Sequence, residues 1–468
     1  MPLRRIVIRG ADLTAHLAAL RSELKVPGPF PVDVEDEARR AASSLSPDGY
    51  DDATDLDLVT LDPPGSRDLD QAFAISARAD NGFDVAYAIA DVAAFVTPGG
   101  AVDQEAHLRG ETLYLPDERV PLHPLSLSEG VASLLPGEKR PAVLWQFHLD
   151  AIGKVLHTSV RRAVVRSRAQ LDYPSFATTG GPLVPLLQQI GELRKERERK
   201  RGGISLPEPE QQLTRNGGHW ELSFRAPLPV EDWNAQLSLM TGMAAAKLML
   251  GAGIGVLRTM PQPDQHVVHT LRRSALALHV DWPEGASYKD VVGKLDPSVP
   301  AQAALIRLAA ALFRGASYAA FDGAPPEQTL QSAVAAPYAH ATAPLRRLVD
   351  RYVSECCLAA YAGTKPPDWV RTALPALPEA MADADRRAHA VDRAVVDLAE
   401  ALLLQDRVGE HFRGVVVEVE RDGRGEVQLA DPAVRARLKG DDLPLGQEVD
   451  VVLAAADVTT RHVEFVLG

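Results

Sequence analysis

The first residues of the chain show the hydrophobic spacing of short helices. Leucines recur at positions 13, 17, 20 and 24, which predicts a helix over residues 13–25 with Asp12 as its N-cap. Prolines at positions 27, 29 and 31 end this helix, and a second helix is predicted over residues 33–42. We therefore expect residues 1–54 to form a small helical N-terminal region.

Residues 55–406 change from a strand pattern to a helix pattern near their middle. Alternating hydrophobic and polar positions dominate up to about residue 170, and helical periodicity dominates after residue 185. The predicted helices cover residues 230–250, 301–321, 344–362 and 377–405. Taken alone, this order predicts a mixed α/β body.

The last stretch, residues 411–468, returns to short strands. Strands are predicted at 412–420, 426–429, 448–453 and 462–466, and short strands spaced this closely suggest a small barrel. Phe412 and Phe465 are its only aromatic residues. Stacking on nucleic acid would then be weak, and the barrel could instead act as a structural lid.

Three aspartates stand close together where two predicted strands meet. Asp62, Asp68 and Asp70 surround Pro63-Pro64-Gly65, which predicts a tight loop between a strand over 55–61 and another over 72–75. Asp68 and Asp70 share a face if their segment is extended, and the loop can fold Asp62 back towards them. Gathered carboxylates repel one another, and a hard divalent cation such as magnesium would relieve that cost. The alternative is a solvated, Asp-rich turn.

The overall charge argues against a generic nucleic-acid binder. The net charge of −13 would repel phosphates over most of the surface. Basic residues nevertheless cluster at 161–168, 194–201 and 346–351. The 194–201 cluster also contains Glu196 and Glu198, which favours a solvated helix face with charge pairs over a phosphate track.

The sequence lacks the marks of several other classes of protein. No stretch of roughly 18 uncharged apolar residues occurs and the N-terminus lacks a signal-peptide core, so we expect no transmembrane helix and no membrane partner. No Walker motif or GxSxG elbow is present, and no nucleotide cofactor is expected. The adjacent Cys356 and Cys357 predict reduced, buried thiols, which favours the cytoplasm.

Five segments of the chain together resemble one known family. In chain order they are TLDPPGSRDLDQA (60–72), ADVAAFV (90–96), the long block 98–142, YAHATAPLRR (338–347) and the closing helix 385–406. In order and spacing they resemble the ribonuclease II family of processive 3′→5′ exoribonucleases. The resemblance covers roughly residues 30–468.

The resemblance implies an α/β multidomain fold. Residues 55–406 would form an RNB-type catalytic domain with a β-rich first half, a helical second half and a central channel. Residues 411–468 would form an OB-fold barrel that binds single-stranded RNA. Family members often begin with two cold-shock domains, for which residues 1–54 are too few. That region is then a structural cap or a helical docking element.

The resemblance also assigns roles to single residues. The three aspartates match the family's metal ligands, and Asp70 and Arg346 are expected to be catalytic. Arg346 matches the arginine placed near the scissile phosphate, where a guanidinium stabilises developing charge; its alternative is a salt bridge at a helix start. Tyr114 matches the tyrosine that holds the 3′-terminal nucleotide, although a lone tyrosine is often a core residue. Asp392 matches an acidic residue that contacts the RNA end.

The chain departs from the family at several of these positions. Gln71 stands where the family has a fourth aspartate, so we expect one firmly held metal and a second recruited by substrate phosphate. Ile254 lies where the family often stacks an aromatic residue on the innermost bases, and 236–240 reads QLSLM in place of an acidic pair. His340 lies near Arg346 in sequence, but a structural role is favoured for a lone histidine.

Together these observations predict a hydrolytic 3′→5′ exoribonuclease. It would use Mg²⁺, or Mn²⁺ in its place, to degrade single-stranded RNA to nucleoside 5′-monophosphates, and would act as a monomer. The main rival is a catalytically weakened or inactive family member that binds RNA or serves as a scaffold. A third hypothesis is action on single-stranded DNA as well, because contacts to the 2′-hydroxyl cannot be identified from sequence.

Overall fold

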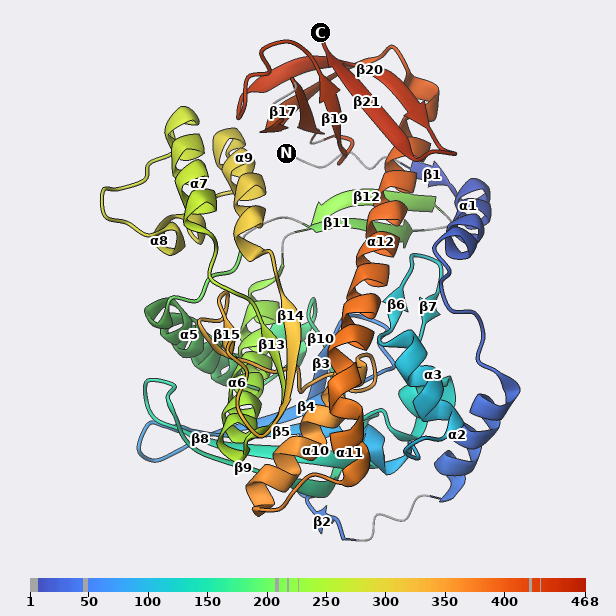
Figure 1. Cartoon of the computed structure of the whole chain (residues 1–468), viewed down its shortest axis with the longest axis vertical. Helices are drawn as coiled ribbons and strands as arrows, with labels where there is room; N and C mark the ends of the chain where they lie inside the picture. Colours follow the sequence, from blue (N-terminus) through green and yellow to red (C-terminus); the bar gives the residue numbers. More distant parts are fainter. Residues whose placement is uncertain are drawn as a thin grey trace.

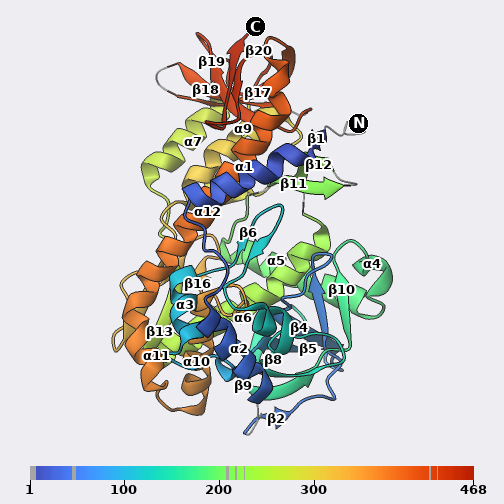
Figure 2. The same ribbon diagram turned by 90° about the vertical axis from the view of Figure 1, so that its right-hand side faces the viewer.

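The computed structural model has a barrel at one end and a large sheet at the other (Figure 1). It describes residues 7–44, 49–206, 210–216, 219–225, 227–420, 423–429 and 431–468. The long helix α12 (Leu377–Leu404) runs from the sheet end to the barrel, as a second view at right angles also shows (Figure 2). Within the described part of the chain, no helix is both long and apolar enough to cross a membrane.

The sheet is built from the first half of the chain and is buried on both faces. Its strand order is β10-β3-β4-β5-β8-β9-β2, and only the pairs β10–β3 and β2–β9 are parallel. Large side chains such as Tyr87 and Trp145 pack on one face, and small ones such as Ala88 and Ala142 on the other. The bounds are β2 Asp51–Asp52, β3 Val59–Asp62, β4 Gln71–Ala77, β5 Phe83–Ala90, β8 Lys139–Leu149, β9 Val155–Arg166 and β10 Ala169–Asp172.

Helices that follow the sheet in the sequence cover the face that carries the large side chains. Residues of α5 (Leu183–Arg201), α6 (Pro229–Ala252) and α10 (Leu348–Ala362) share one core with that face. The helices predicted over 230–250 and 377–405 are confirmed as α6 and α12. Cys356 and Cys357 are free and buried in α10, as expected.

The helices predicted over 301–321 and 344–362 are both shorter than expected. Over 301–321, helix α9 (Pro300–Ala309) continues only as a 3₁₀ turn to Phe313, and strand β14 (Ser317–Asp322) follows. Gly315 between them takes a φ of +86°, which suits glycine and breaks the helix. Strand β14 pairs with β13 (Ile254–Thr259), a partner that local periodicity does not reveal.

A small lobe of three helices has its own core. Helices α7 (Gln265–Ala277), α8 (Tyr288–Val292) and α9 bury Leu271, Val292 and Leu305 together. The barrel residue Val417 belongs to the same buried cluster. The lobe therefore packs beneath the barrel, on the side away from α12 (Figure 1).

The N-terminal region is mainly helical, as predicted. Helix α1 (Gly10–Glu23) buries its leucines against α12, and α2 (Val32–Ser44) packs on the sheet face with small side chains. Because α1 begins at Gly10, Asp12 lies inside its first turn and is not the predicted N-cap. The short strand β1 (Val7–Arg9) extends the hairpin of β11 (Glu210–Asn216) and β12 (His219–Arg225).

The C-terminal residues form the predicted barrel. It is closed in the order β17-β18-β19-β21-β20. The strands are β17 His411–Val419, β18 Arg424–Leu429, β19 Arg435–Lys439, β20 Glu448–Asp457 and β21 His462–Leu467. Phe412 and Phe465 pack edge to face in its interior with ring centroids 5.6 Å apart. The barrel therefore presents no aromatic ring from these residues for stacking on a base.

One buried carboxylate joins α12 to the barrel and to the β11–β12 hairpin. Glu400 is 3% exposed, and its Oε1 accepts hydrogen bonds from the Arg435 backbone N–H at 2.8 Å and from Gln211 Nε2 at 2.7 Å. Burial raises the pKa of the Glu400 carboxyl from 4.5 to about 7. The folded protein therefore binds this proton more tightly than the unfolded chain, and its stability falls as pH rises from about 4.5 to about 7.

We expect the Glu400→Gln variant to lack this pH dependence. Glutamine keeps an acceptor oxygen without the charge. As pH rises through this window, the unfolding free energy of the variant minus that of the parent should therefore increase by up to about 1.4 kcal/mol per pH unit. Urea denaturation across the window measures the gain. The matched control is Glu448→Gln, an exposed barrel carboxylate, and equal gains in both variants would contradict the assignment.

Candidate active site

The three aspartates lie at the turn from β3 to β4. Asp62 ends β3, and the loop turns back through Gly65, whose φ of +80° suits glycine. Ser133 holds the returning limb, because its Oγ accepts from Leu69 N at 3.0 Å and donates to Arg67 O at 2.6 Å. This fixed loop presents its polar side chains to a cavity.

The cavity has a volume of about 570 Å³ and gathers most of the predicted site residues. We call it the acidic cavity. Six of the residues named from the sequence line it: Asp62, Asp68, Asp70, Gln71, Tyr114 and Arg346. They come from the sheet, from the segment after α3 (Ala101–Arg109) and from the turn before α10.

Asp62 is the least satisfied of the three carboxylates. Its Oδ2 is buried and has no hydrogen-bond partner among the described residues. Burial raises the pKa of the Asp62 carboxyl to about 7, partly opposed by the positive charge of Arg346. An oxygen held in this way is available to a cation.

Asp70 joins the sheet to the helical half of the chain. It is 3% exposed, and its Oδ1 accepts from Leu345 N at 2.7 Å while its Oδ2 accepts from Arg346 Nε at 3.1 Å. Burial raises the pKa of Asp70 to about 7, and the neighbouring Arg346 guanidinium opposes that shift. The Arg346 side chain keeps 45% of its surface exposed, so the rest of the guanidinium faces the cavity.

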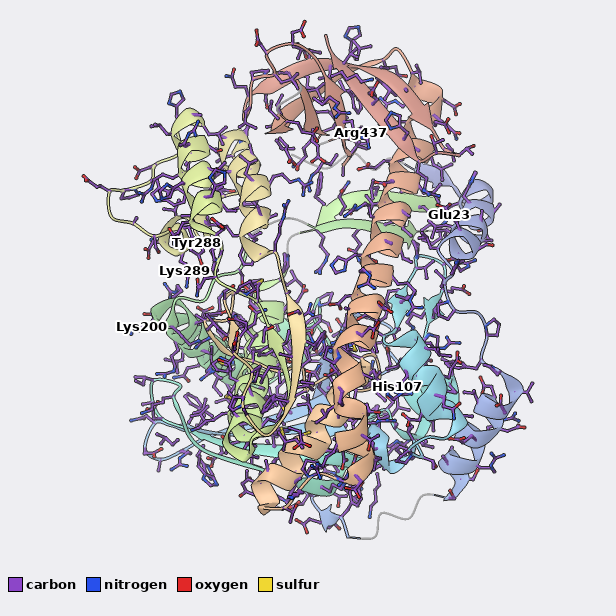
Figure 3. The ribbon with its side chains drawn as sticks, viewed as in Figure 1. Glu23, His107, Lys200, Tyr288, Lys289 and Arg437 are labelled. Carbon is purple, nitrogen blue, oxygen red and sulfur yellow. The ribbon has the colours of Figure 1, made fainter. Side chains whose placement is uncertain are left out.

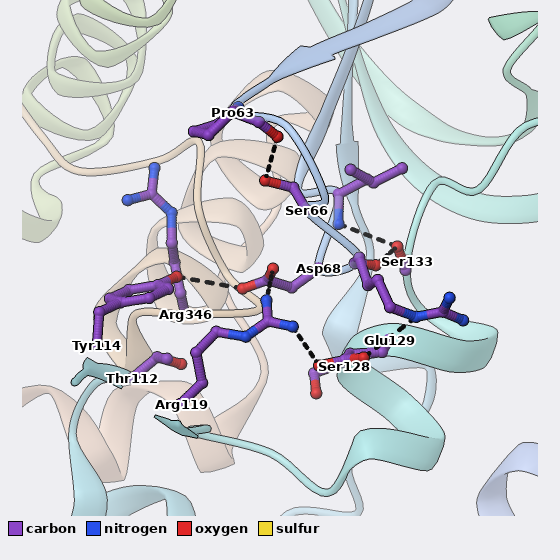
Figure 4. A network of polar contacts seen from close by, with 12 residues as sticks. Pro63, Ser66, Asp68, Thr112, Tyr114, Arg119, Ser128, Glu129, Ser133 and Arg346 are labelled. Carbon is purple, nitrogen blue, oxygen red and sulfur yellow. Dashed lines mark hydrogen bonds and ion pairs between the residues drawn. The ribbon is translucent and has the colours of Figure 1, made fainter. Parts of the chain in front are cut away.

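Asp68 is held by two side chains from the 98–142 block. Tyr114 donates its hydroxyl to Asp68 Oδ2 at 3.1 Å, and Arg119 pairs with Asp68 Oδ1 (Figure 4). Arg119 also donates to Glu129 at 2.6 Å. Arg119 was not identified from the sequence, although it lies in the block that carries most of the family resemblance.

The carboxylates line one cavity without forming a ready ligand set. Among the described residues, no three acidic, histidine or cysteine side chains are close enough to hold an ion. Asp68 is paired with Arg119 and Asp70 with Arg346. The donor chemistry still fits a hard cation, because the set is all oxygen and Asp62 contributes a buried, unpartnered one.

The amide oxygen of Gln71 is hydrogen-bonded where the sheet meets α6. Its Oε1 accepts from Tyr87, which is fully buried, and from Ser238 Oγ at 3.1 Å. Tyr87 and Ser238 are themselves 2.8 Å apart. The neutral amide thus belongs to a neutral hydrogen-bonded trio, which explains how its oxygen is occupied without a cation.

The turn that carries Arg346 is fixed by a buried aspartate. Asp350 accepts from Ala343 N at 2.7 Å and from Arg347 at 2.6 and 2.9 Å. These bonds keep the turn non-helical, so α10 starts at Leu348 and the helix predicted from residue 344 is four residues too long. Thr112 N also donates to Arg346 O at 2.9 Å, which ties this turn to the segment that bears Tyr114.

Two further polar residues of the acidic cavity were missed in the sequence. Asn234 of α6 donates to the Tyr173 hydroxyl at 3.0 Å, and both line the cavity beside Asp62. Tyr173 follows β10, the parallel neighbour of β3. No motif marks either residue, because their position depends on this long-range pairing.

Three candidate residues lie outside the acidic cavity. Ile254 is buried at the start of β13 and packs in the core. His340 is enclosed by Tyr318 and Tyr338, and its Nδ1 is 2.7 Å from the Tyr318 hydroxyl. Burial lowers the pKa of His340 well below its usual value, which fits a neutral structural role.

Asp392 lines a neighbouring space that we call the upper cavity. This space has a volume of about 800 Å³ and lies between α12, the β11–β12 hairpin, α9 and the barrel. Tyr114 lines both cavities. Asp392 is therefore placed beyond Tyr114, on the barrel side of the acidic cavity.

Comparison with known proteins identifies two domains along the chain. Residues 50–362 match the RNB domain, and residues 410–468 match the RNase II-type exonuclease C-terminal S1 domain. Ribonuclease R of Thermotoga maritima is 26% identical over 437 residues, which cover 86% of this chain and 60% of that protein. The chain spans about half the length of the curated relatives it matches.

Solved structures share the fold. RNase R of Mycoplasma genitalium in its apo form gives a TM-score of 0.85 at 19% identity, over 98% of this chain and 78% of that one. Yeast Ssd1, described as a pseudonuclease, gives 0.70 at 16% identity, over 91% of this chain and 53% of that one. Because the RNB-domain match covers more than half of the sequence, this chain belongs to the RNB-domain family.

Proposed function

We propose that the chain is a 3′→5′ exoribonuclease that uses a divalent metal to hydrolyse single-stranded RNA to nucleoside 5′-monophosphates. The observation that carries the proposal is the acidic cavity, where Asp62, Asp68 and Asp70 meet the partly exposed Arg346. Membership of the RNB-domain family and relatives named ribonuclease R support it. RNase R of Mycoplasma genitalium has also been solved with ribose-methylated single-stranded RNA.

Asp62, Asp68 and Asp70 would hold the metal. When bound, a magnesium or manganese ion supplies an activated water and stabilises the leaving oxygen. Asp68 can bind a cation without leaving Arg119 unpaired, because Arg119 keeps Glu129 as a second partner. Since the oxygen of Gln71 is occupied by Tyr87 and Ser238, we propose one firmly held metal, with a second recruited by substrate phosphate.

Arg346 and Tyr114 would act on the RNA itself. The exposed part of the Arg346 guanidinium can donate hydrogen bonds to the oxygens of the scissile phosphate, where negative charge builds. Tyr114 is fixed through its hydroxyl and lines both cavities, so it can hold the terminal nucleotide at their junction. Asp392 in the upper cavity would contact the RNA end from the other side.

The organisation of the chain is part of the same proposal. Residues 1–54 would act as a helical cap, residues 55–406 as the catalytic domain and residues 411–468 as the RNA-binding barrel. We propose that this unit acts as a monomer and without a nucleotide cofactor.

The rival hypothesis, an inactive RNA-binding protein, is favoured by two observations. Gln71 replaces a carboxylate expected in the family, and the fold also resembles that of the pseudonuclease Ssd1. Action on single-stranded DNA is a further alternative, which depends on contacts to the 2′-hydroxyl. A cleavage assay separates all three.

The primary test is a time course on 5′-labelled single-stranded RNA, with DNA of the same sequence in parallel. We expect fragments that shorten from the 3′ end with magnesium, and full-length RNA with a chelator or with Asp70→Asn. Asn at position 70 keeps the shape but loses the charge that would hold a cation. RNA that is bound but stays intact in both magnesium and manganese would establish the rival hypothesis.

We expect Arg346→Lys to slow catalysis much more than it weakens binding. A lysine keeps the charge but cannot offer the fork of parallel donors, so kcat should fall by about 100-fold or more while KM changes little. Single-turnover kinetics on a short RNA measure both. Arg67→Lys, at a side chain that is 64% exposed on the neighbouring loop, is the control. A loss confined to KM would assign Arg346 to uniform binding.

Gln71→Asp is expected to strengthen metal binding. The added carboxylate beside Asp70 should lower the magnesium concentration for half-maximal rate by about tenfold, equivalent to about 1.4 kcal/mol. Calorimetric titration with magnesium gives affinity and stoichiometry independently of activity. Gln71→Asn has the same shape as the aspartate without its charge, and an equal response from both variants would exclude a ligand role at this position.

A further inference from the structure

A third cavity lies on the α7–α9 lobe. It has a volume of about 390 Å³ and, among the described residues, shares no lining residue with the acidic or the upper cavity. Its walls come from the residues before α7, one face of α7 and the loop into α8. Its polar and aromatic lining residues include Gln262, His269, Arg272, Trp282, Ser287 and Tyr288. We call it the lobe pocket.

Two aromatic rings of the lobe pocket are held in fixed positions. The indole N–H of Trp282 donates to Ala286 O at 3.0 Å, and the Tyr288 hydroxyl donates to Gln262 Oε1 at 3.3 Å. Both side chains also pack against the buried core of the lobe without being fully buried themselves. Rings that are already fixed lose little conformational entropy when a planar group stacks on them.

Positive charge accompanies both rings. The Arg272 guanidinium lies 5.4 Å from the centroid of the Trp282 ring and donates to the same Ala286 carbonyl at 2.9 Å. Lys289 Nζ lies 5.7 Å from the centroid of the Tyr288 ring. Lys289 also lies beside Gly202, directly after the last turn of α5, which carries Arg199, Lys200 and Arg201. Lys200, Tyr288 and Lys289 lie along the same side of the molecule (Figure 3).

Negative charge is absent from the lining of the lobe pocket. Within the described part of the chain, no aspartate or glutamate lines it. Of the acidic residues close by, Asp264 accepts from His266 N at 2.7 Å, and Asp290 accepts from Ser287 N and Oγ at 2.9 and 2.6 Å. Asp281 and Glu284 flank Trp282 in the sequence without lining the pocket, so the fixed charge that an anionic ligand with a planar ring would meet among the described lining residues is that of Arg272.

The lobe pocket contains partly exposed aromatic rings, whereas both phenylalanines of the barrel are buried. Single-stranded nucleic acids are held by aromatic rings next to positive charge. Phe412 and Phe465, the only aromatic residues of the barrel, are both buried inside it. The lobe packs against the barrel through Val417, and its Trp282 and Tyr288 rings are only partly buried.

We propose that the lobe pocket binds a nucleobase and adjacent phosphate of single-stranded RNA, upstream of the 3′ end that enters the acidic cavity. Trp282 and Tyr288 stack on the base, and Arg272 and Lys289 contact phosphate. The proposal rests on the proposed function for the identity of the RNA. The same chemistry suits a free nucleoside monophosphate, so the experiment includes both ligands.

The first experiment maps contacts by photo-crosslinking. The Asp70→Asn protein, which should leave RNA intact, is irradiated with RNA containing 5-bromouridine and digested with trypsin. We expect crosslinks on the peptide of residues 274–289, which contains both Trp282 and Tyr288. Excess unlabelled RNA should abolish them, and nucleoside monophosphates at the same nucleotide concentration should not. No crosslink on this peptide, or equal competition by monophosphates, would overturn the proposal.

The second experiment separates stacking from folding. Trp282→Ala should weaken the binding of a long RNA about fivefold or more, while Trp282→Phe, which keeps a ring, should change it less than twofold. Lys289→Gln should lower the slope of log Kd against log salt by about one. The control is Tyr361→Ala, an exposed tyrosine on α10.

A short RNA that cannot reach the lobe pocket is the internal control. All the lobe variants should cut it at the parental rate, and an equal loss with short and long RNA would overturn the proposal. Parental protein that cuts RNA without crosslinking to residues 274–289 refutes the lobe site alone. Crosslinking to residues 274–289, together with parental protein that leaves RNA intact, refutes the proposed activity and supports the lobe site.

Discussion

The contact between Asp70 and the turn at Leu345 and Arg346 joins the two halves of this protein. The partners lie 276 positions apart in sequence, and the Asp70 carboxylate is almost completely buried between them. Burying a charge is unfavourable unless it is paired and hydrogen-bonded, and Asp70 satisfies this requirement with one backbone amide and one guanidinium. Because the sheet supplies the Asp70 carboxylate and the helical half supplies the Arg346 guanidinium, the acidic cavity forms only when the chain is folded.

A second buried aspartate, Asp350, binds the same turn with a backbone amide and a guanidinium. Asp350 is fully buried and binds both the backbone of the Arg346 turn and the Arg347 side chain. Removing a partner from such a pair typically costs about 3–5 kcal/mol, since a buried charge is left without compensation. Asp70 therefore holds the Arg346 guanidinium at the cavity while Asp350 holds the backbone of its turn from outside the cavity, and the exposed part of the guanidinium is preorganised for an anion.

Local sequence was sufficient for the parts of the fold whose signals are local. The loop at Pro63-Pro64-Gly65 and the long periodic helices α6 and α12 were found where predicted. Strand β14 was mistaken for helix, because its strand character depends on pairing with β13 more than fifty residues earlier. The same limit applies to the site: the run of aspartates was visible, but the partners of Asp68 and Gln71 come from segments that only the folded sheet brings together.

The net charge of the chain was a poor guide for the same reason. The positive charges that matter are few and placed individually, such as Arg346 in the acidic cavity and Arg272 in the lobe pocket. The upper cavity is mixed in charge, because Asp392, Asp397, Glu400 and Glu426 line it together with three arginines.

The unpartnered oxygen of Asp62 bears on whether the acidic cavity still binds a cation or has lost that ability. A buried oxygen without a hydrogen bond costs about 1–3 kcal/mol, and a neutral residue of similar shape would remove most of that cost. A protein that only bound RNA or served as a scaffold would gain stability by losing this carboxylate. Gln71 shows how the sheet accommodates a neutral side chain at the neighbouring position, through Tyr87 and Ser238. A destabilising carboxylate kept beside an amide whose oxygen is hydrogen-bonded is the arrangement expected of a site that still binds a cation.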